Sequence, residues 1–189
     1  VPILTPEFCN PLFLKIICDT LESSDRRDFP NGFNGISEIF RKYFTHLDEK
    51  FAESKQEYKY RNVVSTSVDL LAMPIFKAEF NLLKMQDADS ILADKFPGCS
   101  CLLAYLIDNN VLLKTKYTHD DKNVDCVVFN YQRVGDYVIA GELVKKYSDW
   151  DLFTNNIKTD VDLRSIFIDS CWVHRGVLEA LAVLIPETY

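Results

Sequence analysis

The chain has 189 residues, of which 48% are hydrophobic, so it can bury one large core or two small ones. Its 21 lysines and arginines are outnumbered by 28 aspartates and glutamates, which argues against a DNA partner because DNA is bound by cationic groups that displace counterions from phosphates. The longest apolar stretches, residues 11–18 and 101–107, fall far short of the roughly 20 residues that span a bilayer, and no signal segment opens the chain. We expect a cytoplasmic protein without a membrane partner.

The amino-terminal third is predicted to hold two helices. The first starts at Asn10 and Pro11, an N-cap residue followed by a proline whose missing amide hydrogen the first helical turn does not need. The second shows apolar residues at i, i+3, i+4 and i+7. The expected elements are helices at residues 11–21 and 36–51, a loop at 22–35 and a polar boundary at 53–61.

The middle of the chain is predicted to alternate helices with short strands. Pro74 cannot donate a hydrogen bond to the preceding turn, so a kink or a junction of two helices is expected there. Asp87 and Ser100 are predicted N-caps, and Asn109 and Asn110 provide a left-handed helix exit. The expected elements are helical residues 62–80, a strand at 82–86, helices at 88–96 and 101–108, and two β-type runs at 111–118 and 124–131.

The two β-type runs form a predicted hairpin. Leu113, Thr115 and Tyr117 alternate with Lys114 and Lys116, which is the period of a half-buried strand. Helix, short strand, helix, turn, helix and hairpin is the element order typical of a winged helix.

The carboxy-terminal part is predicted to be helical throughout, with a break after the first helix. Pro186 is expected to stop the last helix. Paired helices at this end are typical of the first unit of a solenoid. The predicted fold class is therefore mainly α. The expected helices are residues 132–147, 161–170 and 175–185.

The six cysteines predict neither a disulfide framework nor a metal site. Most of them lie inside apolar runs, where reduced cysteine behaves as a small hydrophobic residue. The one close pair, Cys99 and Cys101, has no second pair or neighbouring histidine and lacks the spacing of tetrahedral zinc coordination.

No catalytic motif is present in the sequence. It contains no G-x-x-x-x-G-K-[ST] phosphate loop, no G-x-G-x-x-G after a strand and no H-E-x-x-H. The three histidines, His46, His119 and His174, have no partner at helical spacing, and nothing favours a cysteine–histidine nucleophile pair. We expect no enzymatic activity from this chain.

The helix expected to take the place of a DNA-recognition helix has the wrong chemistry for DNA. Residues 99–110 contain no arginine or lysine and are dominated by apolar side chains, whereas DNA readers offer arginine, lysine, asparagine or glutamine to bases and phosphates. We expect this surface to be buried against protein. The hairpin lysines Lys114, Lys116 and Lys122 are offset by Asp120, Asp121 and Asp125.

Three stretches carry a resemblance to a known family. They are the helix start Asn10-Pro11-Leu12-Phe13-Leu14-Lys15, the run Val128-Phe129-Asn130-Tyr131-Gln132-Arg133-Val134-Gly135-Asp136-Tyr137-Val138-Ile139-Ala140, and Gly176-Val177-Leu178-Glu179-Ala180-Leu181-Ala182 before Pro186-Glu187. In this order and spacing they resemble, over nearly the whole chain, the region downstream of the ATPase core in bacterial STAND NTPases, especially the antiviral STAND proteins of phage defence.

The resemblance implies three domains. Residues 1–58 would form a small helical domain, residues 59–147 a winged-helix domain with a β-hairpin wing, and residues 148–189 the root of a helical-repeat sensor. It places the phosphate loop and the magnesium-binding acid upstream, so the parent protein is expected to be an ATPase that binds ADP or ATP with Mg mostly outside this chain. The start Val1-Pro2-Ile3-Leu4, without a methionine, favours an interior piece of such a protein.

The mechanism that the resemblance implies is a two-state rotation. ADP holds the winged helix on the upstream ATPase domain, and recognition of a phage protein by the carboxy-terminal sensor releases it, which allows ATP exchange and homo-oligomerisation. Two residues take roles by position in this scheme. Pro11 matches the proline that packs against adenine. Tyr131 stands where many relatives have a histidine that senses the β-phosphate, and its hydroxyl can donate one hydrogen bond but brings no charge.

Other classes remain open. A winged-helix transcription regulator requires a basic recognition surface and salt-sensitive DNA binding. A winged-helix scaffold that only docks protein subunits requires a parent without an upstream phosphate loop. A hydrolase ranks last, because no nucleophile, base or metal cluster is assembled. A plain helix-start role for Pro11 and a packing role for Tyr131 are the alternatives for the two site residues.

Overall fold

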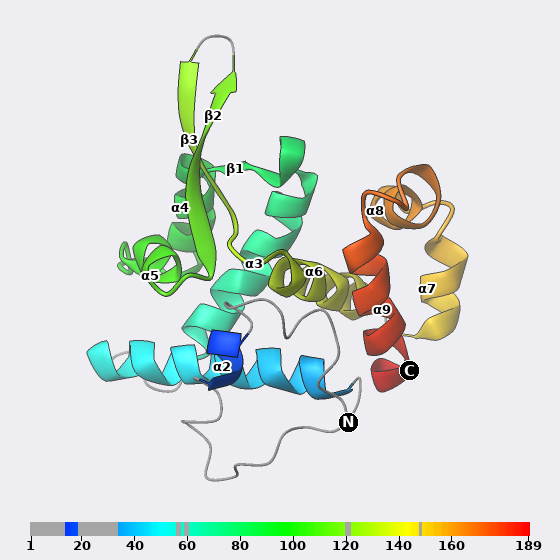
Figure 1. Ribbon diagram of the computed structural model, residues 1–189, viewed down its shortest axis with the longest axis horizontal. Helices are drawn as coiled ribbons and strands as arrows, with labels where there is room; N and C mark the ends of the chain where they lie inside the picture. Colours follow the sequence, from blue (N-terminus) through cyan, green and yellow to red (C-terminus); the bar gives the residue numbers. More distant parts are fainter. Residues whose placement is uncertain (1–13, 19–33, 56–57, 59–60, 120–121, 148) are drawn as a thin grey trace. The chain divides into compact units, whose positions relative to one another are not determined.

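The computed structural model describes residues 14–18, 34–55, 58, 61–119, 122–147 and 149–189, and these are mainly helical with a small three-stranded antiparallel sheet (Figure 1). They form two compact units, one of Asp48–Gly135 and one that joins Val1–Leu47 with Asp136–Tyr189. The domain boundaries expected at residues 58 and 147 stay predictions. Within the described part, no helix combines the length and the apolar character that crossing a membrane requires.

The unit Asp48–Gly135 is built around three helices, α3 (Val63–Lys77), α4 (Met85–Lys95) and α5 (Leu102–Asp108), which contact one another. A short 3-10 turn, η3 (Glu79–Asn81), follows α3. The apolar core is formed by the sides of these helices that face one another, and the periodically spaced apolar side chains are the ones that are buried. The largest fully buried side chains of this unit are Phe51, Leu71, Ile75, Leu92, Leu102, Leu106 and Leu112.

The sheet of this unit has the strand order β1-β3-β2. β1 (Leu83–Lys84) pairs with β3 (Lys122–Phe129), which forms an antiparallel hairpin with β2 (Leu112–His119). α4 contacts β3 and α5 contacts β2, and Figure 1 shows the hairpin extending beyond these helices. The predicted hairpin is confirmed, but Leu113 is 49% exposed, whereas Leu112 beside it is buried.

A kink or a junction of two helices was expected at Pro74; α3 runs through this residue as one helix, so the junction is wrong and the kink stays a prediction. The proline lies in the last turn, where it removes only the donor to the Leu70 carbonyl. The N–H of Ala78 still donates to the carbonyl oxygens of Pro74 and Ile75, at 3.1 and 3.2 Å, and completes the turn. Leu71 and Ile75 are buried on either side of it and hold this turn in the core.

The two N-caps predicted in this unit are also wrong. α4 begins at Met85 with Lys84 as its N-cap, and α5 begins at Leu102 with Cys101 as its N-cap, and neither cap side chain makes a capping hydrogen bond. Asp87 instead lies in the first turn of α4, where a negative charge is favourable. The left-handed exit is confirmed at Asn110, whose φ is 59°.

The regular elements in the described residues of the other unit are all helical. Residues 14–18 are helical within the predicted helix 11–21, whose remainder lies outside the described residues. α2 (Asn34–Ser54) confirms the predicted helix 36–51 and continues into the unit Asp48–Gly135. The remaining elements are α6 (Gln132–Lys146), which begins at the end of that unit, α7 (Trp150–Asn156), α8 (Val161–Arg164), the π-helical turn η4 (Ser165–Asp169) and α9 (Arg175–Thr188).

The carboxy-terminal helices pack around Phe153, which is fully buried and stacks on Trp150 with ring centroids 6.0 Å apart. Tyr189 closes this cluster, and its hydroxyl donates to the carbonyl oxygens of Val144 and Tyr147 at the end of α6, at 3.2 and 3.1 Å. Val144 lies in the last turn of α6 and Tyr147 directly follows it, and carbonyl groups at such a helix end have no partner within the helix. The predicted stop at Pro186 is wrong, since α9 continues to Thr188.

Asp160 is the main electrostatic feature of these helices. Its carboxylate accepts the N–H groups of Asp162 and Leu163, both at 3.0 Å, and pairs with the ammonium group of Lys146. Burial raises the pKa of Asp160, but the hydrogen bonds from Lys146 and the Leu163 N–H outweigh it and lower the pKa to about 2. The carboxylate thus caps α8 and ties it to α6.

Acid is expected to remove the stabilisation that Asp160 provides. Because the folded pKa is lowered to about 2, this contribution is complete above pH ~4 and is lost as the pH falls toward ~2. Urea unfolding measures this contribution. Near neutral pH, Asp160→Asn should lower the free energy of unfolding by about 2 kcal/mol. Near pH ~2, the variant and the unchanged chain should have nearly the same free energy of unfolding. Asp151→Asn, at an exposed position of α7, is the matched control. A constant difference between Asp160→Asn and the unchanged chain at all pH values would contradict this role.

Candidate functional site

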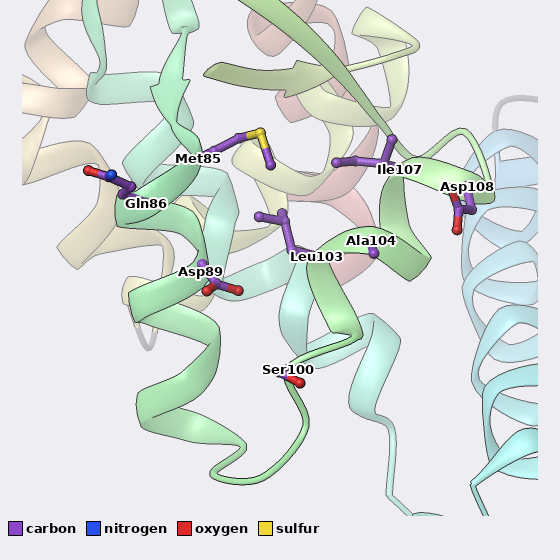
Figure 2. A pocket seen from close by; sticks show the side chains of 8 residues that line it. All are labelled: Met85, Gln86, Asp89, Ser100, Leu103, Ala104, Ile107 and Asp108. Carbon is purple, nitrogen blue, oxygen red and sulfur yellow. The ribbon is translucent and has the colours of Figure 1, made fainter. Parts of the chain in front are cut away.

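A groove of about 400 Å³ lies between α4 and α5. Figure 2 shows the side chains of Met85, Leu103 and Ile107 pointing into the space between the two helices, with Ser100 on the segment that enters α5. The groove is therefore apolar along its floor and polar along its edges. The full lining is Met85, Gln86, Asp89, Ser100, Leu103, Ala104, Ile107 and Asp108.

The inner face of α5 fixes the position of this helix. Leu102 and Leu106 are 1% and 0% exposed, and Tyr105 packs edge-on against Phe51 with ring centroids 4.9 Å apart. Burial, followed by the negative charges of Asp48 and Glu53, raises the pKa of Tyr105 to about 12, so its hydroxyl stays protonated. The outer face of α5, where Ala104 and Asp108 are exposed, is thus presented on a firmly packed helix.

Only part of the surface expected to contact protein is available for that purpose. Leu102, Leu103 and Leu106 were expected on a docking surface, but they are at most 5% exposed and belong to the core of their own unit. These leucines are buried because α5 is short and contacts α3, α4 and β2 together. What remains outside is the narrower strip formed by Ala104, Ile107 and Asp108 together with the groove.

The charges around the groove are acidic. Asp89 and Asp108 are the charged residues in its lining, and no lysine or arginine lines it. On the hairpin, the Lys114 ammonium lies 2.8 Å from the Asp125 carboxylate, and this contact holds the pKa of Asp125 below its usual value. The expected offset of hairpin lysines is thus confirmed for Lys114. Asp120 and Asp121 lie outside the described residues.

No family model, curated protein or solved structure matches this chain. What the groove binds is therefore argued from the chemistry of its own residues. Its apolar floor fits aliphatic or aromatic side chains, and its carboxylates favour lysine or arginine and disfavour phosphate. Where side chains are described, no group of three potential metal ligands gathers at the groove or elsewhere.

The two predicted nucleotide-binding residues have different outcomes. Pro11 lies outside the described residues. Tyr131 is partly buried and directly precedes α6, and its carbonyl oxygen accepts the N–H groups of Val134 and Gly135 at 3.0 and 3.3 Å. It is not part of the groove lining, so the structure does not join it to the groove.

The glycine in the stretch around Tyr131 serves close packing. A Cβ atom on Gly135 would lie 2.6 Å from Cδ2 of the Phe129 ring, so only glycine lets the first turn of α6 approach the end of β3 this closely. Gly176 has the same function between α9 and α6, since a Cβ there would lie 1.9 Å from a carboxylate oxygen of Asp136. Both glycines belong to the stretches that carry the family resemblance.

The α4 side of the groove was missed by sequence reasoning. Met85 and Asp89 are four residues apart on α4 and therefore share a helix face, which was the available signal. The helix was expected to start at residue 88, which left Met85 outside it. Its true start at Met85 places this face beside Leu103 and Ile107 of α5.

Proposed function

We propose that residues 59–147 form a winged-helix module that contacts protein. The order of the elements from α3 to β3, helix, strand, helix, helix and hairpin, supports this proposal. So does the pairing of the first strand with the outer edge of the hairpin strand β3. The module belongs to the regulatory region of a cytoplasmic STAND-type nucleotide switch in antiphage defence, as the family resemblance implies.

The acidic groove is the observation that carries the choice of protein over DNA. In a DNA-reading winged helix, the helix corresponding to α5 brings cationic or amide side chains to the duplex. Here α5 carries one charged residue, Asp108, and the groove beside it adds Asp89. The occupant that fits is a segment of the upstream ATPase domain with apolar side chains and a flanking lysine or arginine.

The exposed apolar residues before α9 support the sensor part of the proposal. Trp172 and Val173 are 87% and 72% exposed, and Ile168 nearby is 49% exposed. Such a group of large apolar side chains is unusual on a free surface. A following helical repeat of the sensor would cover it, which is how neighbouring units of a solenoid bury their apolar faces.

The nucleotide in this proposal is ADP or ATP with Mg, bound mainly by the upstream domain. Tyr131 lies at the junction of β3 and α6 and would donate its hydroxyl to the β-phosphate in the ADP-bound arrangement. ADP can bias the switch only if it contacts the two arrangements unequally, and this hydrogen bond would exist in one of them. The matching role of Pro11 is contact with the adenine.

Calorimetry with ADP and ATP tests the switch. The chain extended upstream through the ATPase domain is expected to bind both nucleotides, and the chain of 189 residues alone neither. Tyr131→Phe in the extended chain should weaken ADP about tenfold, as expected for one hydrogen bond to a charged acceptor, and should leave ATP nearly unchanged. Tyr117→Phe, on the hairpin, is the matched control.

A docking scaffold without nucleotide is the second candidate, favoured by the groove itself, since the groove needs no nucleotide to bind a peptide segment. Absence of ADP and ATP binding by the extended chain would support the scaffold and contradict the switch. Equal loss of ADP affinity in Tyr131→Phe and Tyr117→Phe would leave Tyr131 with a packing role only.

A further inference from the structure

Two thiol groups lie side by side where the chain enters α5. The Sγ atoms of Cys99 and Cys101 are 3.8 Å apart. Cys99 is buried at 7% exposure and Cys101 is partly exposed, so solvent reaches one member of the pair more easily. Both are free thiols, as are Cys18, Cys126 and Cys171.

We propose that Cys99 and Cys101 form a reversible oxidation site, at which a peroxide converts the dithiol into an intramolecular disulfide. The Cys101 thiol reacts with hydrogen peroxide to give a sulfenic acid and one water molecule. The Cys99 thiol then attacks the sulfenic sulfur, forms the S–S bond and releases a second water molecule. Two thiols and one peroxide thus give one disulfide and two waters.

The order of the two steps follows from burial. Desolvation, together with the neighbouring Cys101 thiol, raises the pKa of Cys99, and a raised pKa leaves less of the reactive thiolate. The more accessible Cys101 therefore meets the oxidant first. Cys99 needs no encounter with solvent, because its sulfur already lies beside the reacting sulfur.

The surrounding backbone permits the bond to close and keeps it reducible. The sulfur atoms must approach by about 1.8 Å to reach the length of a disulfide. Gly98 directly precedes the pair and has a φ of 90°, a backbone conformation that residues with a side chain rarely adopt. A disulfide across a single intervening residue is strained, and strained disulfides are the labile ones that thiols reduce readily.

Oxidation at this site has a direct path to the groove. Ser100 lies between the two cysteines and lines the groove. The carbonyl oxygen of Cys101 accepts the N–H of Tyr105 at 2.8 Å in the first turn of α5, whereas the Leu102 N–H lies 3.4 Å from the Cys99 carbonyl oxygen. Closing the disulfide therefore moves Ser100 and disturbs the start of α5, so that oxidation changes one end of the groove.

Peptide mapping of the purified chain tests the site. Trypsin cleaves after Lys95 and Lys114, so Cys99 and Cys101 fall in one peptide, residues 96–114, that contains no other cysteine. After mild peroxide treatment and alkylation, this peptide should lack two hydrogens and carry no alkyl group, and dithiothreitol should restore both alkylation sites. Amide hydrogen exchange of Tyr105 should be faster in the oxidised chain.

Matched variants separate the pair from general oxidation. Cys101→Ser and Cys99→Ser should each abolish the peptide disulfide, and the first of these changes a partly exposed position that tolerates serine. Cys171→Ser should leave it intact. The proposal is overturned if peptide 96–114 stays fully alkylated, or carries sulfinic acid without a disulfide, under conditions that oxidise Cys171. It is also overturned if Cys101→Ser leaves the disulfide signal unchanged.

Discussion

Replacing Ala104 by arginine is expected to weaken binding of the proposed upstream ATPase domain about thirtyfold or more without unfolding the chain. Ala104 is exposed on the outer face of α5 and lines the groove of about 400 Å³. A long cationic side chain there fills the groove and places a positive charge beside Asp108, which is expected to attract a cation of the partner. Central interface positions of this kind cost 2 kcal/mol or more, about thirtyfold in affinity. Titration of the ATPase domain with ADP present, followed by calorimetry, measures the loss.

The matched control is Ala93→Arg. Ala93 is an exposed alanine of the adjacent helix α4 and does not line the groove, so the variant adds the same side chain and charge outside the site. Its affinity should stay within about threefold of the unchanged chain. Circular dichroism of both variants shows whether the fold is kept. An unchanged affinity of Ala104→Arg, or an equal loss in Ala93→Arg, would count against the groove as the docking site.

Replacing Asp48 by alanine is expected to cause the largest loss of stability. Asp48 lies on α2 at 8% exposure and accepts the N–H of Val64 at 2.6 Å, the N–H of Ser65 and the Ser65 hydroxyl. These groups belong to the first turn of α3, whose N-cap residue Asn62 makes no side-chain capping bond. Asp48→Ala leaves buried donors without an acceptor, which should lower the free energy of unfolding by about 3 kcal/mol. Urea unfolding at neutral pH measures the change.

Asp48→Asn tests whether the acceptor or the charge stabilises this junction. Burial is the largest influence on Asp48 and raises its pKa, so the charged form is disfavoured at this site. The amide oxygen of asparagine can accept the same backbone N–H groups, and the loss should be about 1 kcal/mol. Asp94→Ala, at an exposed position of α4, should change little. A loss in Asp48→Asn as large as in Asp48→Ala would show that the charge itself is required.

Elements that depend on the spacing of apolar residues or on turn-forming residues were predicted correctly from the sequence. The apolar spacing of residues 36–51 predicted α2, and the β-type runs around residues 119–123 predicted the hairpin. The left-handed exit at Asn110 followed from the tolerance of asparagine for positive φ. These features depend on neighbours along the chain, which a sequence displays.

Features that depend on contacts across the fold were not predictable. Pro74 was expected to cause a kink or a junction of two helices, and Pro186 was expected to stop the last helix, but α3 and α9 continue through these prolines to Lys77 and Thr188. Each proline lies near the end of its helix, so that it removes a single backbone hydrogen bond from the last turn. α7 was missed for a different reason: its cap, Asp149, accepts the N–H of Leu152 at 2.8 Å and is a local signal that the sequence contains.

In the candidate site, too, local features were predictable from the sequence and features that depend on tertiary contacts were not. The absence of basic residues from α5 was visible in the sequence and argued against DNA as its partner. Which leucines of α5 face inward depended on packing against α3, α4 and β2, so the exposed surface was overestimated. The distance of 3.8 Å between the Sγ atoms of Cys99 and Cys101 depends on the turn that Gly98 permits, and it could not be predicted from the sequence.

In the proposed function, the α4–α5 face contacts protein and not DNA. Fluorescence anisotropy of the labelled chain of 189 residues, titrated in parallel with duplex DNA and with the ADP-bound upstream domain, tests it most directly. We predict saturable binding of the domain and no binding of DNA at low salt. Salt-sensitive binding of DNA, together with no binding of the domain, would contradict the claim and would assign the module to the transcription regulators.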